Sequence, residues 1–96
     1  MTRKLTLTHF ATGEVLTGVA NLITREVTVT MPSGEVLRGK YTTVEQNDAG
    51  TNITASALLK SDTSKLMLEL KLTGNEFGSG FGEAETNDGR KYKVQF

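Results

Sequence analysis

Hydrophobic and polar residues alternate with a period of two along much of the chain. The longest such run is 66–72, where four leucines alternate with Met67, Glu69 and Lys71. This alternation is typical of a strand with one buried face, whereas a helix would scatter the leucines around its axis. We therefore expect a strand over residues 65–73, with its leucines in the core.

The same alternation, interrupted by turn residues, divides the rest of the chain into further strands. The predicted strands are 2–10, 14–20, 26–31, 35–44, 51–60, 65–73, 77–86 and 91–96. Residues 55–60 could instead form a short helix, and residues 21–25 suit a bulge or a wide connection. Because most of the predicted connections fall in the usual range of hairpin loops, an antiparallel meander is favoured.

The predicted fold is all-β: a single domain of residues 1–96 with an antiparallel meander of about eight strands, which closes into a small barrel or folds into two packed sheets. With 96 residues, of which 36% are hydrophobic and 6% aromatic, the chain can bury only a thin core. The predicted core comprises Leu5, Leu7, Val27, Val29, Leu66, Leu68, Leu70, Leu72, Val94 and Phe96.

An internal repeat supports the hairpin prediction. Residues 12–18 and 33–39 are identical at five of seven positions, with an offset of 21 residues, and an alternating apolar run precedes each copy. A looser third copy is 82–92, where Asn87-Asp88-Gly89 takes the turn. The first glycine of each copy is a turn residue, whereas the second lies inside a strand and implies a bulge or a close approach by a neighbour.

The strand predicted for residues 77–86 has one nearly bare face. Phe77 and Phe81 lie on one side, and a row of glycines at 78, 80 and 82 lies on the other. This row does not precede a helix, so it does not form a phosphate-binding loop. We expect the glycines to receive aromatic rings from neighbouring strands, with Tyr41 and Tyr92 as candidates, or to allow the sharp coiling of a closing sheet.

Charge and composition exclude several classes of function. Eleven basic residues balance eleven acidic ones, which argues against a nucleic-acid partner and against an anionic membrane surface. Cations beside Tyr41 and Tyr92 keep an oligonucleotide or oligosaccharide binder as an alternative. The absence of cysteine excludes disulfides and thiolate metal sites, and no apolar run is long enough to predict an integral membrane segment.

No group of residues points to a reaction. His9 is the only histidine and has no partner histidine or cysteine, so we expect it at the rim of a strand. Glu83, Glu85 and Asp88 could approach a cation, or Glu83 and Glu85 could serve an enzyme as a carboxylate pair, but the spacing lacks the glycine-punctuated pattern of a calcium loop. The prediction is a non-enzymatic protein without a catalytic residue, metal site or cofactor.

Two resemblances add to this interpretation. Residues 27–41 and 80–96 resemble the MORN repeat, a hairpin with a glycine turn and a second glycine, although Leu37-Arg38-Gly39 lacks the aromatic residue of that repeat and no glycine follows Tyr92. Residues 78–92 resemble small all-β domains of bacterial lipoproteins and of the periplasm, whose function is unassigned. This second resemblance implies a periplasmic or outer-membrane-anchored location.

The leading functional hypothesis is a binding or structural module of a bacterial cell envelope that contacts a protein partner through strand edges or loops. Open strand edges would also allow homo-oligomers. The alternative is a small lipocalin-like barrel that binds an apolar small molecule. Its predicted ligand-binding residues are Tyr41, Phe77, Phe81 and Tyr92.

Overall fold

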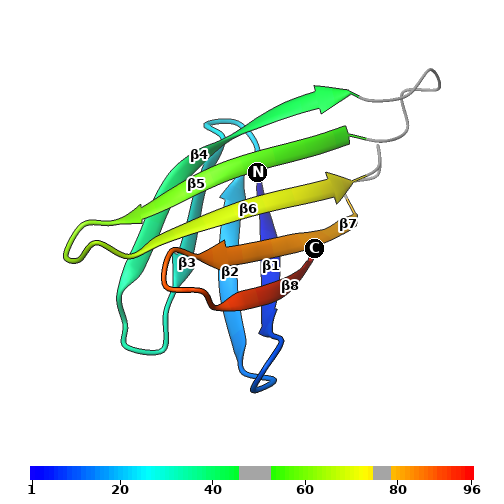
Figure 1. Cartoon of the computed structure of the whole chain (residues 1–96). Coiled ribbons are helices and arrows are strands. Elements are labelled where there is room, and N and C mark those ends of the chain that lie inside the picture. The colour runs from blue at the N-terminus through cyan, green and yellow to red at the C-terminus, as the bar shows by residue number, and fades with distance from the viewer. Residues whose placement is uncertain (46–52, 75–78) are drawn as a thin grey trace.

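The protein forms a closed barrel of eight antiparallel strands (Figure 1). The computed structural model describes residues 1–45, 53–74 and 79–96. The strands are β1 (Thr2–His9), β2 (Val15–Asn21), β3 (Glu26–Thr30), β4 (Val36–Glu45), β5 (Ile53–Ser61), β6 (Met67–Gly74), β7 (Gly80–Thr86) and β8 (Lys91–Gln95). All regular secondary structure in these described ranges is strand, so the fold class predicted from the sequence is confirmed, and residues 55–60 are not helical.

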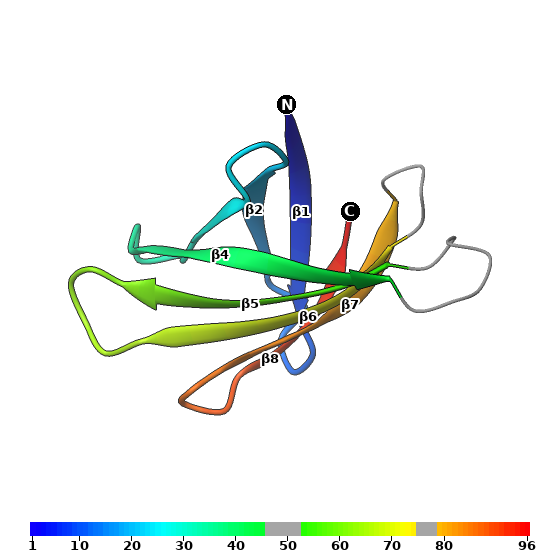
Figure 2. The ribbon, with the colours of Figure 1, turned by 90° about the horizontal axis from the view of Figure 1, so that it is seen from above.

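The meander closes because β1 pairs with both β2 and β8. Its pairing with β2 runs from Thr2 to Thr8, whereas its pairing with β8 covers only Thr6 to His9. Seen from above, β4, β5 and β6 cross β1 at a steep angle (Figure 2). The sheet is therefore strongly coiled, and this coiling brings the first and last strands together as a barrel, which excludes the alternative of two separate sheets.

The core follows the alternation along the strands. On β6, Leu68 and Leu70 are completely buried, while the intervening Glu69 is exposed. Seven of the ten predicted core residues are buried, and the other three, Leu66, Leu72 and Phe96, are partly buried and pack against the core. The buried core comprises Leu5, Leu7, Leu16, Ala20, Val27, Val29, Met31, Leu37, Ala57, Leu59, Leu68, Leu70, Ala84, Tyr92 and Val94.

The repeated hairpins have the turns that the sequence predicts. Gly13, Gly34 and Gly89 have φ angles of 76°, 90° and 96°, which a residue without Cβ adopts without strain. The second glycines are places of close approach: a Cβ at Gly18 would lie 2.9 Å from Val29 Cγ2, and one at Gly39 would collide with the Leu58 carbonyl.

The connection between β2 and β3 is a tight turn, not the bulge or wide connection expected for residues 21–25. The Arg25 amide donates a 2.8 Å hydrogen bond to the Asn21 carbonyl, and Arg25 has a φ of 66°. The Asn21 side chain also accepts hydrogen bonds from the Ile23 and Thr24 amides, at 2.9 and 3.0 Å. An asparagine that imitates a backbone acceptor in this way stabilises a turn that the adjacent Leu22 and Ile23 do not predict.

The two ends of the barrel differ. The β1–β2, β3–β4, β5–β6 and β7–β8 turns lie at one end, and the β2–β3 turn, the N-terminus and Phe96 lie at the other (Figure 1). At this second end β4 leaves β3 after Lys40 but stays paired with β5 as far as Glu45. The barrel wall is therefore taller on the side of β4, β5 and β6.

Candidate ligand-binding cavity

The end of the barrel near the N-terminus opens into a cavity of about 150 Å³. Its deep part is formed by buried side chains, which are Leu5, Ala20, Val27, Ala57 and Leu70. Its mouth is formed by half-buried or exposed residues, which are Arg3, Leu22, Tyr41, Thr43, Ile53 and Phe96. The change from buried to exposed side chains along the lining shows which side of the cavity faces solvent.

The cavity exists because alanines occupy inward positions of β5. Ala57 lies between Tyr41 of β4 and Leu70 of β6, and Ala55 lies between Thr43 and Leu72. At the next inward position Leu59 is completely buried and fills the barrel. Protein interiors otherwise pack as densely as organic crystals, so two successive alanines leave space that the opposite strands do not fill.

The ring of Phe96 forms part of the wall, and glycines make room for it. A Cβ at Gly80 would lie 2.5 Å from Phe96 Cζ and would also collide with the Thr73 carbonyl, and a Cβ at Gly74 would lie 3.3 Å from the same Cζ. The bare face of β7 thus points into the barrel and receives an aromatic ring, as expected. The ring is that of Phe96, however, and not that of Tyr41 or Tyr92.

Arg3 is the only charged residue among the described residues that line the cavity. It precedes Leu5 and Leu7 on the inner face of β1, so its side chain shares their direction. Its Nε atom is buried and makes no hydrogen bond within the part of the chain that the structure describes. A buried donor without a partner costs about 1–3 kcal/mol, so Arg3 at this position lowers the stability of the fold.

The four aromatic residues predicted to bind a ligand do not form one site. Tyr41 lines the cavity. Tyr92 is completely buried near the opposite end, where its ring packs edge-on against His9 with centroids 5.0 Å apart. Phe81 is 64% exposed and points out of the barrel, and Phe77 lies outside the described residues. Among the described members of this set, only Tyr41 is at the cavity.

Arg3 was missed as a candidate site residue, although a signal for it exists. It stands two and four residues before Leu5 and Leu7, and a period of two places all three on one face. The alternation of Tyr92, Val94 and Phe96 with polar residues predicts that Phe96 belongs to the core. Nothing in the sequence indicates that it lies beside the cavity.

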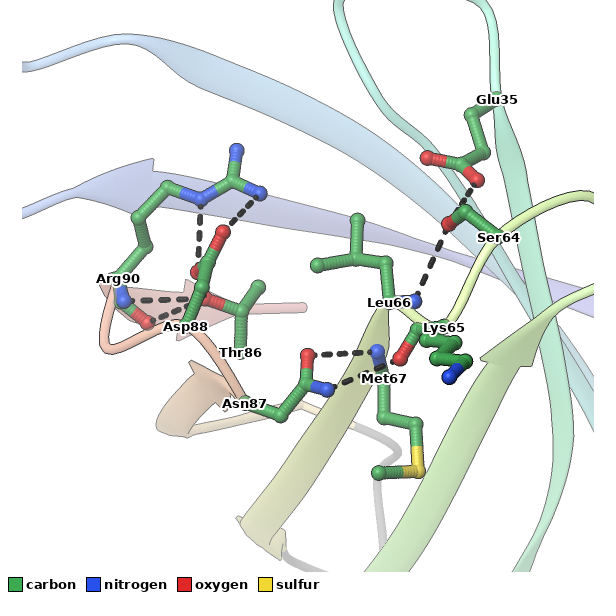
Figure 3. A network of polar contacts seen from close by, with 9 residues as sticks. All are labelled: Glu35, Ser64, Lys65, Leu66, Met67, Thr86, Asn87, Asp88 and Arg90. Atoms are coloured by element: carbon green, nitrogen blue, oxygen red, sulfur yellow. Dashed lines mark hydrogen bonds and ion pairs between the residues drawn. The ribbon is translucent and has the colours of Figure 1, made fainter.

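The opposite end of the barrel is tied by polar contacts (Figure 3). In the β7–β8 turn, Arg90 donates from Nε and Nη2 to the two oxygens of Asp88 at 3.1 and 2.9 Å, and the buried Thr86 hydroxyl also donates to Asp88. The hydrogen bonds from Arg90 and then from Thr86 lower the pKa of Asp88 to about 2. These contacts stabilise the turn in its observed form.

A second carboxylate joins two neighbouring turns. Glu35, in the β3–β4 turn, accepts hydrogen bonds from the hydroxyls of Ser61, which ends β5, and of Thr63 and Ser64 in the β5–β6 turn. Figure 3 shows the bond from Ser64, which is 2.5 Å long. These bonds, that of Ser61 first, lower the pKa of Glu35. The three hydroxyls all donate to the Glu35 carboxylate, so this residue links the β3–β4 turn to the β5–β6 turn.

Asn87 links the β7–β8 turn to the start of β6. Its side chain accepts a 2.9 Å hydrogen bond from the Met67 amide and donates a 2.9 Å bond to the Lys65 carbonyl (Figure 3). Asn87 thus satisfies two backbone groups next to the β5–β6 turn, and with the contacts of Glu35 it links three adjacent turns. This end of the molecule is therefore built for rigidity.

The described residues that were candidates for catalysis or metal binding either stabilise a turn or are exposed on the outer face of a strand. His9 ends β1, and its Nδ1 accepts hydrogen bonds from the amides of Ala11 and Thr12 at 3.1 and 3.2 Å. Glu83 and Glu85 are both exposed on the outer face of β7. In the register Glu83 lies between Lys71 and Lys93. Within the described ranges, no group of three potential ligands is placed to hold a metal ion.

Comparison of the chain with protein-family models, with curated proteins and with solved structures found no match. Residues 1–45, 53–74 and 79–96 include no helix that could cross a membrane.

Proposed function

We propose that the protein is a non-enzymatic binding protein that holds a small apolar molecule in the cavity at the open end of the barrel. The observation that carries this proposal is the unfilled, hydrocarbon-lined space beside Ala55 and Ala57. Pockets for small molecules are concave, mostly apolar and supplied with few polar groups, and this cavity has those properties.

The size of the cavity limits the ligand. A cavity of this volume, about 150 Å³, is of the order that holds benzene in a protein core. The apolar part of the ligand should thus contain roughly six carbons, as one ring or a short chain. If such a group buries about 200 Å², it gains about 5 kcal/mol, so the Kd should be no tighter than about 0.2 mM once the loss of ligand freedom is subtracted.

The proposal is tested by titrating the ¹⁵N-labelled protein with benzene and following its amide resonances. We expect saturable shifts centred on Ala57, Leu70 and Tyr41. Ala57→Leu should abolish these shifts by filling the space, and Val19→Leu, on the outer face of β2, should leave them unchanged. Ala55→Leu serves as a second filling variant, because residue 55 is only partly buried and tolerates the change more easily.

Two results would count against ligand binding in this cavity. One is the absence of saturable shifts in the wild-type protein. The other is a set of shifts that both filling variants retain, because the benzene would then bind elsewhere.

Contact with a protein partner and a place in a bacterial envelope stay predictions. Closure of the barrel changes how such a contact would be made, since β1 is paired on both sides over Thr6 to Thr8. Among the described residues, the strand edges still open to a partner are β1 before Thr6 and β4 after Tyr41, besides the outer faces and the turns. Pull-down of a partner that competes with benzene would connect this hypothesis with the cavity.

A further inference from the structure

The cavity contains one feature that a purely apolar ligand leaves unexplained. Arg3 brings a guanidinium group, which carries a positive charge, to the mouth of a hydrocarbon-lined space. Its Nε atom is buried and has no hydrogen-bond partner among the described residues. A neutral hydrocarbon would leave the charge of this guanidinium unpaired, whereas an anionic head group would pair with it.

We infer that the cavity selects small monocarboxylic acids, whose carboxylate binds Arg3 and whose apolar part of roughly six carbons lies between Leu5, Ala57 and Leu70. This inference rests on the proposed function, because it specifies the class of ligand for the same cavity. It also explains why an arginine lies at this position, because no ion pair among the described residues includes Arg3.

The charge of Arg3 is not balanced by the described part of the protein. The ion pairs there are Arg38–Asp62, Lys71–Glu69 and Arg90–Asp88, and none of them includes Arg3. The described lining of the cavity includes no aspartate or glutamate. Apolar walls weaken the screening by water, so an anion at this place is attracted more strongly than it would be at an exposed arginine.

The guanidinium geometry favours a carboxylate. Two of its N–H groups donate parallel hydrogen bonds to the two oxygens of a carboxylate, and a lysine cannot reproduce this arrangement. Nε itself is buried, so in the observed conformation a carboxylate would bind the Nη atoms, and it would reach Nε only after a rotation of the Arg3 side chain. The described residues at the deep end of the cavity include no second cation, so a dicarboxylate would have to bury a charge among Leu5, Val27 and Leu70.

The test compares three ligands of equal length on the full chain by isothermal titration calorimetry. Hexanoate has the required head group, hexanamide has a neutral head of the same shape, and adipate carries a second carboxylate at the far end. We expect the wild-type protein to bind hexanoate about tenfold to hundredfold more tightly than hexanamide, the range of a charge-assisted hydrogen bond. Adipate should bind more weakly than hexanoate by at least the same factor, because its second charge would be buried.

Variants separate the role of Arg3 from that of the cavity. Arg3→Met keeps most of the hydrocarbon stem and should reduce hexanoate affinity to that of hexanamide, with the hexanamide affinity unchanged. Arg3→Lys should retain only part of the preference. Lys4→Met removes the neighbouring exposed cation on the outer face and should change neither affinity.

A measurement on the unmutated protein covers the case in which a variant fails to fold. The Arg3 Nε–H resonance should move on addition of hexanoate and stay in place on addition of hexanamide. Equal affinities of the wild-type protein for hexanoate and hexanamide, or a preference that Arg3→Met retains, would overturn this inference and leave the proposed function standing. Failure of hexanoate, hexanamide and benzene alike to bind would overturn both.

Discussion

The ring of Phe96 packs directly on the backbone of Gly80. The two residues also exchange backbone hydrogen bonds, from Gly80 N to Phe96 O and from Phe96 N to Gly80 O, each 3.1 Å long. A Cβ at Gly80 would lie 2.5 Å from Phe96 Cζ and would collide with the Thr73 carbonyl of β6. The last residue of the chain is thereby held against the inner face of β7, where it forms part of the cavity wall.

Gly80→Ala should destabilise the protein, and Gly80→Val should do so more strongly. The added Cβ meets a backbone carbonyl that cannot rotate away, so either β7 moves from β6 or the Phe96 ring is displaced. We expect a loss of about 1–3 kcal/mol for alanine, measured by urea denaturation. Phe81→Ala, on the outer face of the same strand, should change the free energy of unfolding by less than about 0.5 kcal/mol. An unchanged midpoint for Gly80→Val would show that the close packing of Phe96 on Gly80 is absent in solution.

Adjacent leucines on β5 provide a second matched comparison. Leu59 is completely buried, whereas Leu58 is 47% exposed on the outer face. Leu59→Ala should cost about 2–5 kcal/mol because it leaves a cavity in the core, and Leu58→Ala should cost less than about 1 kcal/mol. Thermal denaturation measures both. Similar losses for the two variants would contradict the direction that the strand gives to each side chain.

The strands and most of the core were predictable because each depends on local alternation. Leu68 and Leu70 identify their strand and its buried face without reference to the rest of the molecule. Barrel closure was not predictable in this way. It depends on the pairing of Thr6 to His9 with the last strand, and that pairing results from the coiling of the whole sheet, which no short segment encodes.

The candidate site was harder to predict because a period of two says which residues share a face but not which of them lie near each other. Tyr41 and Tyr92 both point inward, yet they lie toward opposite ends of the barrel. Phe81 shares only their aromatic character: the glycines on either side of it occupy the inner face of β7, so its own ring points outward. The cavity itself arises because Ala55 and Ala57 occupy successive inward positions of β5, and the residues that surround them are set by the register.

Tyr92→Phe should leave the stability unchanged or raise it by up to about 2 kcal/mol. The Tyr92 hydroxyl is buried and makes no hydrogen bond to the described residues, so its removal relieves an unpaired polar group while the ring contact with His9 remains. Tyr41→Phe serves as a control at a partly buried position, with an expected change below about 0.5 kcal/mol. A loss of more than about 1 kcal/mol in Tyr92→Phe would mean that the hydroxyl has a partner in solution.

The buried hydroxyl of Tyr92 should make the protein less stable in alkali. Burial raises the pKa of Tyr92 above its ordinary value of 10.0. The unfolded chain therefore ionises at a lower pH than the folded one, and the contribution of the neutral phenol, complete below pH 10, is lost as the pH rises further. Wild-type denaturation midpoints should fall more steeply above pH 10 than those of Tyr92→Phe. Parallel profiles would contradict the buried position of the hydroxyl.

Acid should loosen the end of the barrel that carries Asp88 and Glu35. Their pKa values lie below the ordinary values of 3.8 and 4.5, that of Asp88 at about 2. Each carboxylate therefore contributes stability that is complete above its unfolded pKa and is lost as the pH falls through its folded pKa. The wild-type melting temperature should fall between about pH 4.5 and pH 2, and Asp88→Asn should melt lower at pH 7 and lose less on acidification.

The size of this acid effect should be modest, because the Asp88 side chain is 52% exposed and solvent screens its pairing with Arg90. Added sodium chloride should weaken the ion pair but not the hydrogen bond from Thr86, so part of the difference between wild type and Asp88→Asn should survive at high salt. Asp62→Asn is the matched control, since Asp62 is 79% exposed and lies 3.8 Å from Arg38. If Asp62→Asn and Asp88→Asn have the same pH profile, the Asp88 contacts do not hold the β7–β8 turn in the way the structure indicates.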